Sequence, residues 1–97
     1  MRDGQGAVVQ PDGDVVAAAA PEMRAVLRSA VAEGASELVV DLTKVRMVDS
    51  TGLGLLISAH NSLRKAGGRL AVIHASPEVL DLFKSLRIHQ HFSVSGD

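Results

Sequence analysis

The 97-residue sequence contains no cysteine, tryptophan or tyrosine, and it has only two phenylalanines. Without cysteine the chain can form no disulfide, no thiolate metal site and no cysteine nucleophile. The scarcity of aromatic rings argues against binding of single-stranded nucleic acid, because such sites stack bases on aromatic side chains. The formal net charge is only −1, which gives no general attraction to nucleic acid or anionic lipid. We therefore expect no direct nucleic-acid partner.

Long hydrophobic runs are also missing. The longest apolar run, Val15 to Ala20, is far too short to cross a bilayer, and residues 1–10 lack the apolar segment of a signal peptide. We expect a cytoplasmic protein without membrane insertion. The length and the hydrophobic content of 46% fit a single folded domain over residues 1–97. The polar, glycine-rich residues 1–6 are expected to be flexible.

Hydrophobic periodicity predicts alternating strands and helices. Short β-branched runs at residues 37–42 and 69–74 indicate buried strands, the first covered on both faces, and HFSV near the C-terminus indicates a last short strand. Helices are predicted to begin at Pro21, at Asp49 or Ser50, and after Ser76, and glycines should end the first two. The predicted apolar faces are Met23, Leu27, Ala30 and Val31; Leu56, Ala59 and Leu63; and Val79, Phe83 and Leu86.

The segment AVVQPDGDVVAA predicts a β-hairpin. Pro11 presets φ and Gly13 permits a positive φ, so the two residues favour a turn between two short strands. With this hairpin the element order is β β α β α β α, followed by the short final strand. The order predicts an α/β fold with a mixed sheet of four to five strands and helices packed on it.

The sequence DSTGLG, residues 49–54, is the most informative stretch. Asp49, Ser50 or Thr51 can satisfy the first backbone N–H groups of a helix, which gives the stretch a purely structural explanation. Two glycines at a helix start, however, each cost roughly 1 kcal/mol relative to alanine. A leucine between glycines is poorly shielded, so we expect Leu53 to be partly exposed. These features favour a docking surface, where glycines admit a partner's backbone and Leu53 enters a pocket.

Ser50 can turn such a surface into a switch. A phosphate on its hydroxyl adds roughly −1.5 to −2 charges at neutral pH. The dipole at the helix start tolerates this charge in the free protein, although Asp49 opposes it. Inside a packed interface the same charge is desolvated, at a cost of several kcal/mol. A loss of about 4 kcal/mol lowers affinity a thousandfold.

The stretch VVDLTKVRMVDSTGLGLLISAHNSLRKAGGRLAVIHASPEVLDLF resembles the STAS family, and within it the bacterial anti-sigma factor antagonists. The shared pattern is a strand ending in Asp-Leu, a link to Asp-Ser-[Ser/Thr]-Gly-Leu-Gly, a helix, Gly-Gly, a strand and Ser-Pro-Glu-Val. The resemblance covers roughly residues 7–95 and implies a STAS-type α/β fold.

The resemblance also implies a phosphorylation cycle. In that family the serine after the aspartate is phosphorylated by the partner, an anti-sigma factor with serine kinase activity, and this serine corresponds to Ser50. The unphosphorylated antagonist binds the anti-sigma factor and frees the sigma factor. A phosphoprotein phosphatase resets the cycle. The expected partner-binding residues are Asp49, Ser50, Thr51, Gly52, Leu53, Gly54, Leu55 and Ser58.

Two departures from the family pattern keep an alternative open. Val16 stands where the family often has an aspartate beside the phosphorylation site, and Arg87 stands where relatives commonly begin a Gly-Leu turn. Val16 mildly favours a STAS module that stays in a constitutive complex and docks without phosphorylation. Such a module would belong to a stress-signalling scaffold or to a lipid-transport ATPase.

Other chemistries have weaker support. His89 and His91 could face one metal, but the sequence shows no obvious third ligand. VDSTG differs from the G-x-S-x-G nucleophile elbow of hydrolases, and TGLG lacks the phosphate-binding G-x-x-x-x-G-K-[ST] pattern. We therefore expect a binding protein and not an enzyme, with no catalytic residue, cofactor or metal. Any ATP would belong to the kinase partner.

Overall fold

The computed structural model describes residues 6–34 and 36–96 of the chain. In chain order the elements are β1 (Gly6–Val9), the 3-10 helix η1 (Ala17–Ala19), α1 (Ala20–Ala32), β2 (Glu37–Asp41), α2 (Ser50–Lys65), β3 (Arg69–Ile73), α3 (Pro77–Ser85), the 3-10 helix η2 (Ile88–Gln90) and β4 (Ser93–Val94). Of the segment expected to be flexible, residues 1–5 lie outside the described residues, whereas Gly6 is the first residue of β1.

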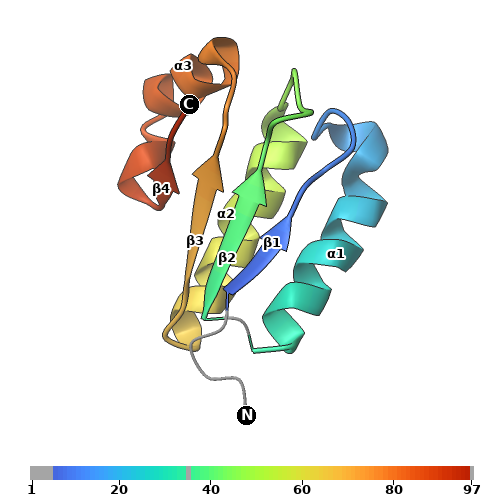
Figure 1. Cartoon of the computed structure of the whole chain (residues 1–97), viewed down its shortest axis with the longest axis vertical. Coiled ribbons are helices and arrows are strands. Elements are labelled where there is room, and N and C mark those ends of the chain that lie inside the picture. Colours follow the sequence, from blue (N-terminus) through green and yellow to red (C-terminus); the bar gives the residue numbers. More distant parts are fainter. Residues whose placement is uncertain (1–5, 35, 97) are drawn as a thin grey trace.

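A four-stranded sheet in the order β1-β2-β3-β4 forms the centre of the fold (Figure 1). All three strand pairings among the described residues are parallel. Parallel neighbours need crossover connections, and α1, α2 and α3 provide them in turn. The predicted α/β class and strand number are confirmed. The pairing in the described sheet is parallel throughout instead of mixed.

The predicted hairpin is wrong. β1 pairs in parallel with β2, and residues 10–14 bend without forming a returning strand. The chain instead carries Val15 into the interior, where its side chain is fully buried and forms an isolated parallel bridge with Val48. Burial of Val15 next to the start of α2 therefore outweighs the local turn preference of Pro11 and Gly13.

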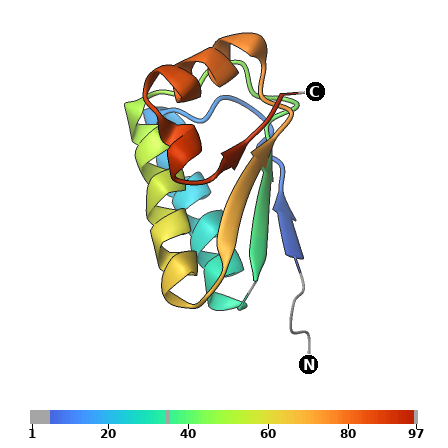
Figure 2. The ribbon, with the colours of Figure 1, turned by 90° about the vertical axis from the view of Figure 1, so that its left-hand side faces the viewer.

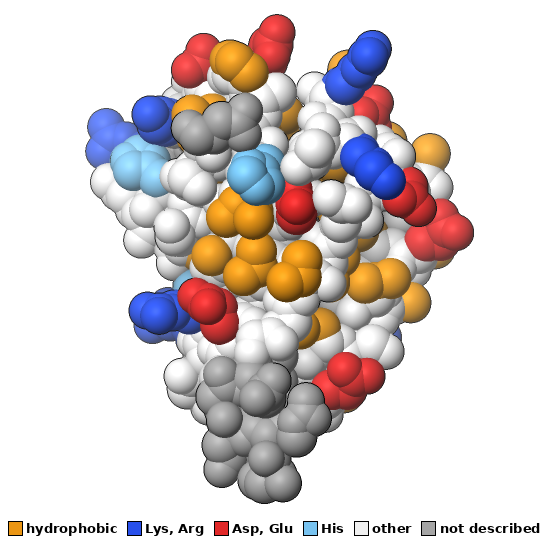
Figure 3. Space-filling model, viewed as in Figure 1, with side chains coloured by type: hydrophobic (Ala, Val, Ile, Leu, Met, Phe, Trp, Pro, Cys, Tyr) orange, Lys and Arg blue, Asp and Glu red, His pale blue; other side chains and the backbone are white. Residues whose placement is uncertain are grey.

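The long helices α1 and α2 cover one face of the sheet (Figure 2). Residues at alternate positions of β2 and β3 are buried; they are Leu38, Val40, Leu70 and Val72. Val39 and Ala71, which lie between them and opposite each other, are only half-buried. Hydrophobic side chains gather in the middle of this second face (Figure 3). The expectation of strands covered on both faces is wrong, because apolar residues on the open face hide the alternation.

The helices begin close to the predicted positions. Pro21 lies in the first turn of α1, Asp49 is the N-cap of α2 and Ser76 is the N-cap of α3. Leu86 departs from the prediction, because it is the C-cap of α3 and is 51% exposed. The helix ends at Ser85, so the apolar stripe no longer meets the core there. None of the helices in residues 6–34 and 36–96 has the length and apolarity needed to cross a membrane.

His60 is the only buried polar side chain among the described residues. Its ring lies on α2, with its centroid 5.4 Å from that of Phe92 in the segment leading to β4. The Nδ1 atom makes no hydrogen bond within the described structure. Burial, followed by the nearby charges of Arg64 and His91, lowers the pKa of His60 below its usual value of 6.5. The neutral ring is therefore the form that the fold favours.

Acid should destabilise the fold through His60. The unfolded chain takes up this proton near pH 6.5, whereas the folded pKa is lower. The free energy of unfolding should thus fall as the pH drops below 6.5 and level off below the folded pKa. Urea unfolding at several pH values should show a flatter slope for His60→Leu. Equal slopes in His60→Leu and the unmodified chain would contradict this assignment.

Candidate functional site

Ser50 is the first residue of α2, in the region beyond the carboxyl end of β2 (Figure 1). β2 ends at Asp41, and residues 42–49 carry the chain to the helix. The carboxyl ends of parallel strands meet at one edge of a sheet, and α/β proteins commonly place binding sites there. The loop after β1 is hydrogen-bonded to the residues just before α2, so two loops meet at the start of this helix.

The carboxylate of Asp49 joins two separate segments. Its Oδ1 accepts a hydrogen bond from the backbone N–H of Gly52 (2.9 Å), which caps α2. Its Oδ2 accepts one from the backbone N–H of Ala17 (3.0 Å), at the start of η1. The Gly52 bond, followed by the Ala17 bond, lowers the pKa of Asp49 below its usual range, because both bonds favour the ionised form. The predicted capping role of Asp49 is confirmed.

Further hydrogen bonds fasten these two segments along their length. The N–H of Val15 donates to the carbonyl of Met47 (3.0 Å), and the N–H of Asp49 donates to the carbonyl of Val15 (3.2 Å). One carboxylate oxygen of Asp14 accepts from the N–H groups of Arg46 and Met47. Neither Asp14 nor Val15 stands out in the sequence.

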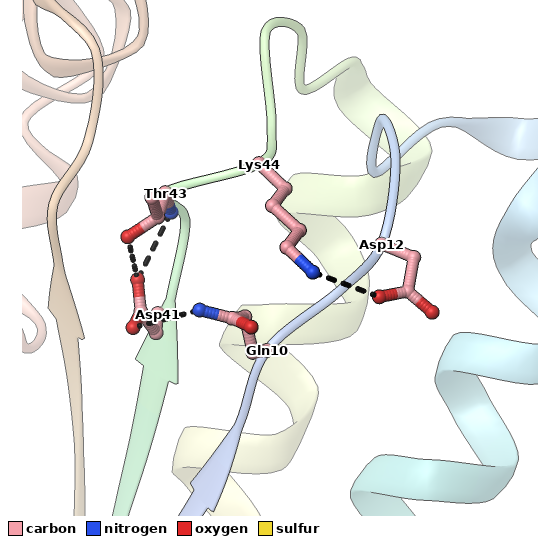
Figure 4. A network of polar contacts seen from close by, with 5 residues as sticks. All are labelled: Gln10, Asp12, Asp41, Thr43 and Lys44. Carbon is pink, nitrogen blue, oxygen red and sulfur yellow. Dashed lines mark hydrogen bonds and ion pairs between the residues drawn. The ribbon is translucent and has the colours of Figure 1, made fainter.

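A second polar network holds the loop after β2 (Figure 4). Asp41 accepts hydrogen bonds from the N–H and hydroxyl of Thr43 and from the side-chain amide of Gln10. The Thr43 hydroxyl is the largest cause that lowers the pKa of Asp41. Lys44 and Asp12 add an exposed ion pair of 3.8 Å, which contributes little stability. The network ties the end of β1 to the loop that leads to Ser50.

The two glycines of DSTGLG have different surroundings. Gly52 is buried, and a Cβ there would lie 2.1 Å from the carbonyl oxygen of Val15. Glycine at 52 thus lets the chain's own segment approach α2, and it does not serve the partner approach that we expected. Gly54 is exposed, and a Cβ there would meet no heavy atom within 4 Å. Packing within the described structure does not require a glycine at position 54.

Most of the predicted contact residues lie on the surface of α2. Ser50, Thr51, Gly54 and Ser58 are exposed, and Leu55 is half-buried. We call these five residues the α2 surface. Because α2 is capped by Asp49 and fastened to the segment before α1, these side chains project from a fixed backbone.

The expectation that Leu53 is partly exposed is wrong. Its side chain is 6% exposed and belongs to the hydrophobic core. Positions three and four residues apart share one face of a helix, so Leu53 lies on the same buried stripe as Leu56 and His60. A side chain in this position has too little accessible surface to enter a partner's pocket. The flanking glycines gave a misleading local signal, because helix periodicity decides which way Leu53 faces.

Metal binding gains no support from the described residues. His89 and His91 are exposed at η2 and directly after it. No group of three His, Cys, Asp or Glu side chains in residues 6–34 and 36–96 is arranged to hold a metal ion. The α2 surface is therefore the candidate site that the geometry favours.

Comparison with known proteins points to STAS domains. The model of the STAS domain matches residues 2–96. Anti-sigma-B factor antagonists from Listeria monocytogenes and Listeria innocua are each 33% identical to the chain over 72 residues, or 74% of its length. The match spans 63% of the length of these curated relatives.

Solved structures share the fold at low sequence identity. A STAS-domain protein of Planctomyces limnophilus, described as an anti-sigma-factor antagonist, has a TM-score of 0.84 at 16% identity, covering 100% of this chain and 87% of its own. The Bacillus protein SpoIIAA has TM-scores of 0.71 unphosphorylated and 0.72 phosphorylated, at 20% and 19% identity. These cover 100% of this chain and 84% and 88% of the SpoIIAA chains. The STAS-type fold predicted from the sequence is confirmed.

Alanine should have opposite effects at the two glycines. Gly52→Ala places a methyl group against the backbone of Val15 and should lower the free energy of unfolding by about 1–3 kcal/mol. Gly54→Ala adds a better helix former in open space and should raise it by up to about 1 kcal/mol. Urea unfolding followed by circular dichroism measures both. A more stable Gly52→Ala would contradict the packing assigned to Gly52, and a less stable Gly54→Ala would contradict the open space assigned to Gly54.

Leu53→Ala should behave as a core substitution. Removal of this buried side chain leaves a cavity and should lower the free energy of unfolding by about 2–5 kcal/mol. Leu55→Ala is the matched control, because Leu55 lies two positions along the same helix and is only half-buried. Denaturant titration of both variants provides the measurement. A loss at Leu53 no larger than that at Leu55 would show that Leu53 is outside the core.

Proposed function

This chain belongs to the STAS domain family, and from that premise we propose that it is an anti-sigma factor antagonist switched off by phosphorylation of Ser50. The Listeria relatives, named as anti-sigma-B factor antagonists, support the antagonist role. The observation that carries the proposed switch is the exposed Ser50 at the first position of α2. The unphosphorylated chain binds its anti-sigma factor through the α2 surface and thereby frees the sigma factor.

The switch is electrostatic. The carboxylate of Asp49 already bonds to Gly52 and Ala17, so a phosphate on Ser50 meets an ionised neighbour that stays in place. The N-terminal dipole of α2 stabilises the added charge while water surrounds it. Against a docked partner the phosphate loses that water and lies beside a second negative group. The cost of several kcal/mol falls on the complex alone, and affinity drops accordingly.

The proposed partner supplies the chemistry. The anti-sigma factor is a serine kinase that binds ATP and transfers its terminal phosphoryl group to the Ser50 hydroxyl, and a phosphoprotein phosphatase later removes it. The chain contributes the acceptor hydroxyl and the docking surface, so its role is binding and not catalysis. We place the protein in the cytoplasm, because sigma factors act there.

A second candidate function has one observation in its favour. Val16 is half-buried at the N-cap of η1, next to Ala17, whose N–H bonds to the carboxylate of Asp49. An apolar side chain thus occupies the segment that meets the start of α2. A STAS module in a constitutive complex, such as a stress-signalling scaffold or a subunit of a lipid-transport ATPase, would dock through the same α2 surface without phosphorylation.

Phosphorylation in a purified system separates the two functions. The chain is incubated with ATP, magnesium and the candidate anti-sigma factor kinase, and the modified residue is mapped by mass spectrometry. We expect phosphate on Ser50, with none in Ser50→Ala and with the phosphate still on Ser50 in Thr51→Ala. Phosphorylated chain should bind the anti-sigma factor about a thousandfold more weakly than unmodified chain, as measured by calorimetry.

Thr51 is exposed next to Ser50 and offers a second hydroxyl to the kinase, so the mapped position of the phosphate distinguishes the two residues. Phosphate on Thr51 would contradict the choice of Ser50. No phosphate on either residue, together with tight binding by Ser50→Asp, would contradict the phosphorylation switch and favour the constitutive module. Circular dichroism of each variant establishes that it is folded before its binding is compared.

A further inference from the structure

A groove of about 290 Å³ runs between α1 and α2. Its lining comes from both helices: Arg24, Leu27, Arg28, Val31 and Ala32 from α1, and Leu55, Ser58, Ala59 and Ser62 from α2. Leu55 and Ser58 also belong to the α2 surface. The groove therefore continues that surface away from Ser50, along the line where the two helices lie against each other.

The groove has a basic wall and an apolar floor. Arg24 and Arg28 are exposed and one helical turn apart, and neither forms an ion pair with a carboxylate in the described residues. None of the lining residues is acidic, and α2 itself contains no Asp or Glu. The half-buried Val31 and Leu55, together with the buried Leu27 and Ala59, give the groove its apolar floor. The chemistry of the groove thus fits an occupant with carboxylates on one side and apolar groups on the other.

We propose that this groove receives an acidic amphipathic helix of the anti-sigma factor, an inference that rests on the proposed function. Residues 24–32 of α1 span roughly 12 Å at 1.5 Å per residue, which accommodates about two turns of a partner helix. Apolar side chains three and four residues apart would contact the floor. Glu or Asp side chains on the flank would pair with the two guanidinium groups, which favour such carboxylate contacts.

A second copy of this chain fits the groove less well. Its acidic helix is α3, with Glu78 in the first turn and Asp81 one turn later. Val79 and Phe83 of that helix are buried in the chain's own core, and its Leu80 and Leu82 are half-buried against that core. A copy could therefore offer carboxylates but not the apolar face that the floor requires. A partner helix with both features is the better match.

The groove begins close to Ser50, the residue of the proposed switch. Leu55 lies five residues after Ser50, which is roughly 7.5 Å along the helix axis. This axial separation places the near end of the groove about one and a half helical turns from Ser50. A partner that fills the groove would therefore also lie over Ser50, and a phosphate there would repel any of its carboxylates that lie close by.

Charge reversal tests the basic wall. The probe is the anti-sigma factor kinase that binds the chain in the Ser50 assay, and calorimetry measures its affinity. Combined Arg24→Glu and Arg28→Glu should lower affinity at least about tenfold and reduce its dependence on salt. Combined Arg64→Glu and Lys65→Glu makes the same charge change at the far end of α2 and should leave affinity nearly unchanged.

A neutral substitution tests the shape of the groove. Ser62→Trp places a large side chain in the groove, outside the α2 surface and without changing charge, and it should lower affinity at least about tenfold. Asn61→Trp introduces the same side chain at an exposed position of α2 outside the groove and is the matched control. Both positions are exposed, so the variants should remain folded, which circular dichroism verifies.

The outcomes separate the groove from the proposed function. Unchanged affinity in both groove variants, with binding lost in Ser50→Asp, would overturn the groove and leave the antagonist function in place. Failure of the unmodified chain to bind any anti-sigma factor kinase would overturn both. A dimer of the free chain that Arg24→Glu and Arg28→Glu dissociate, detected by sedimentation, would assign the groove to a second copy and overturn the proposal.

Discussion

The Asp49 carboxylate is the interaction on which the candidate site depends. It accepts one hydrogen bond from Gly52 at the start of α2 and one from Ala17 before α1. Each helix start leaves backbone N–H groups without intrahelical partners, and here a single acid serves two of them. The shared bond fixes the beginning of one helix relative to the beginning of the other. The α2 surface and the groove between the helices both take their geometry from it.

Close packing makes this bond pair part of a rigid unit. Val15 is fully buried and approaches so near to α2 that Gly52 has no room for a side chain. Gly54 differs, because it lies in open space and weakens the helix without a packing reason inside the described structure. A residue that weakens its helix without improving the packing inside the protein suggests a role outside it, such as contact with a partner. The open space around Gly54 is what we expect of the partner contact that we propose for the α2 surface.

The sequence predicts the elements wherever the determining signal is local. Ser76 caps its helix as expected, and the exposed Ser50 lies where DSTGLG places it. The errors arise where residues far apart in the sequence determine the local structure. The hairpin fails because Val15 bonds to Met47 from another loop, and Leu53 is buried by the face of α2 that the sheet covers. Arg87 shows the converse, since it adopts φ 59°, a conformation that glycine favours, at the position where relatives commonly begin a Gly-Leu turn.

Arg24 and Arg28 illustrate why the α1 side of the groove could not be predicted from the sequence. Along the chain they resemble the solvated face of an amphipathic helix, and only the packing of α1 against α2 turns that face into the wall of a groove. The charge of a single phosphate is comparable in size to that of this basic wall. The two guanidinium groups carry a charge of about +2, and a phosphoserine at Ser50 carries roughly −2 at neutral pH. In the function that we propose, phosphorylation of Ser50 adds negative charge to the surface that an acidic partner contacts, while the hydrogen bonds of Asp49 hold the backbone at the start of α2.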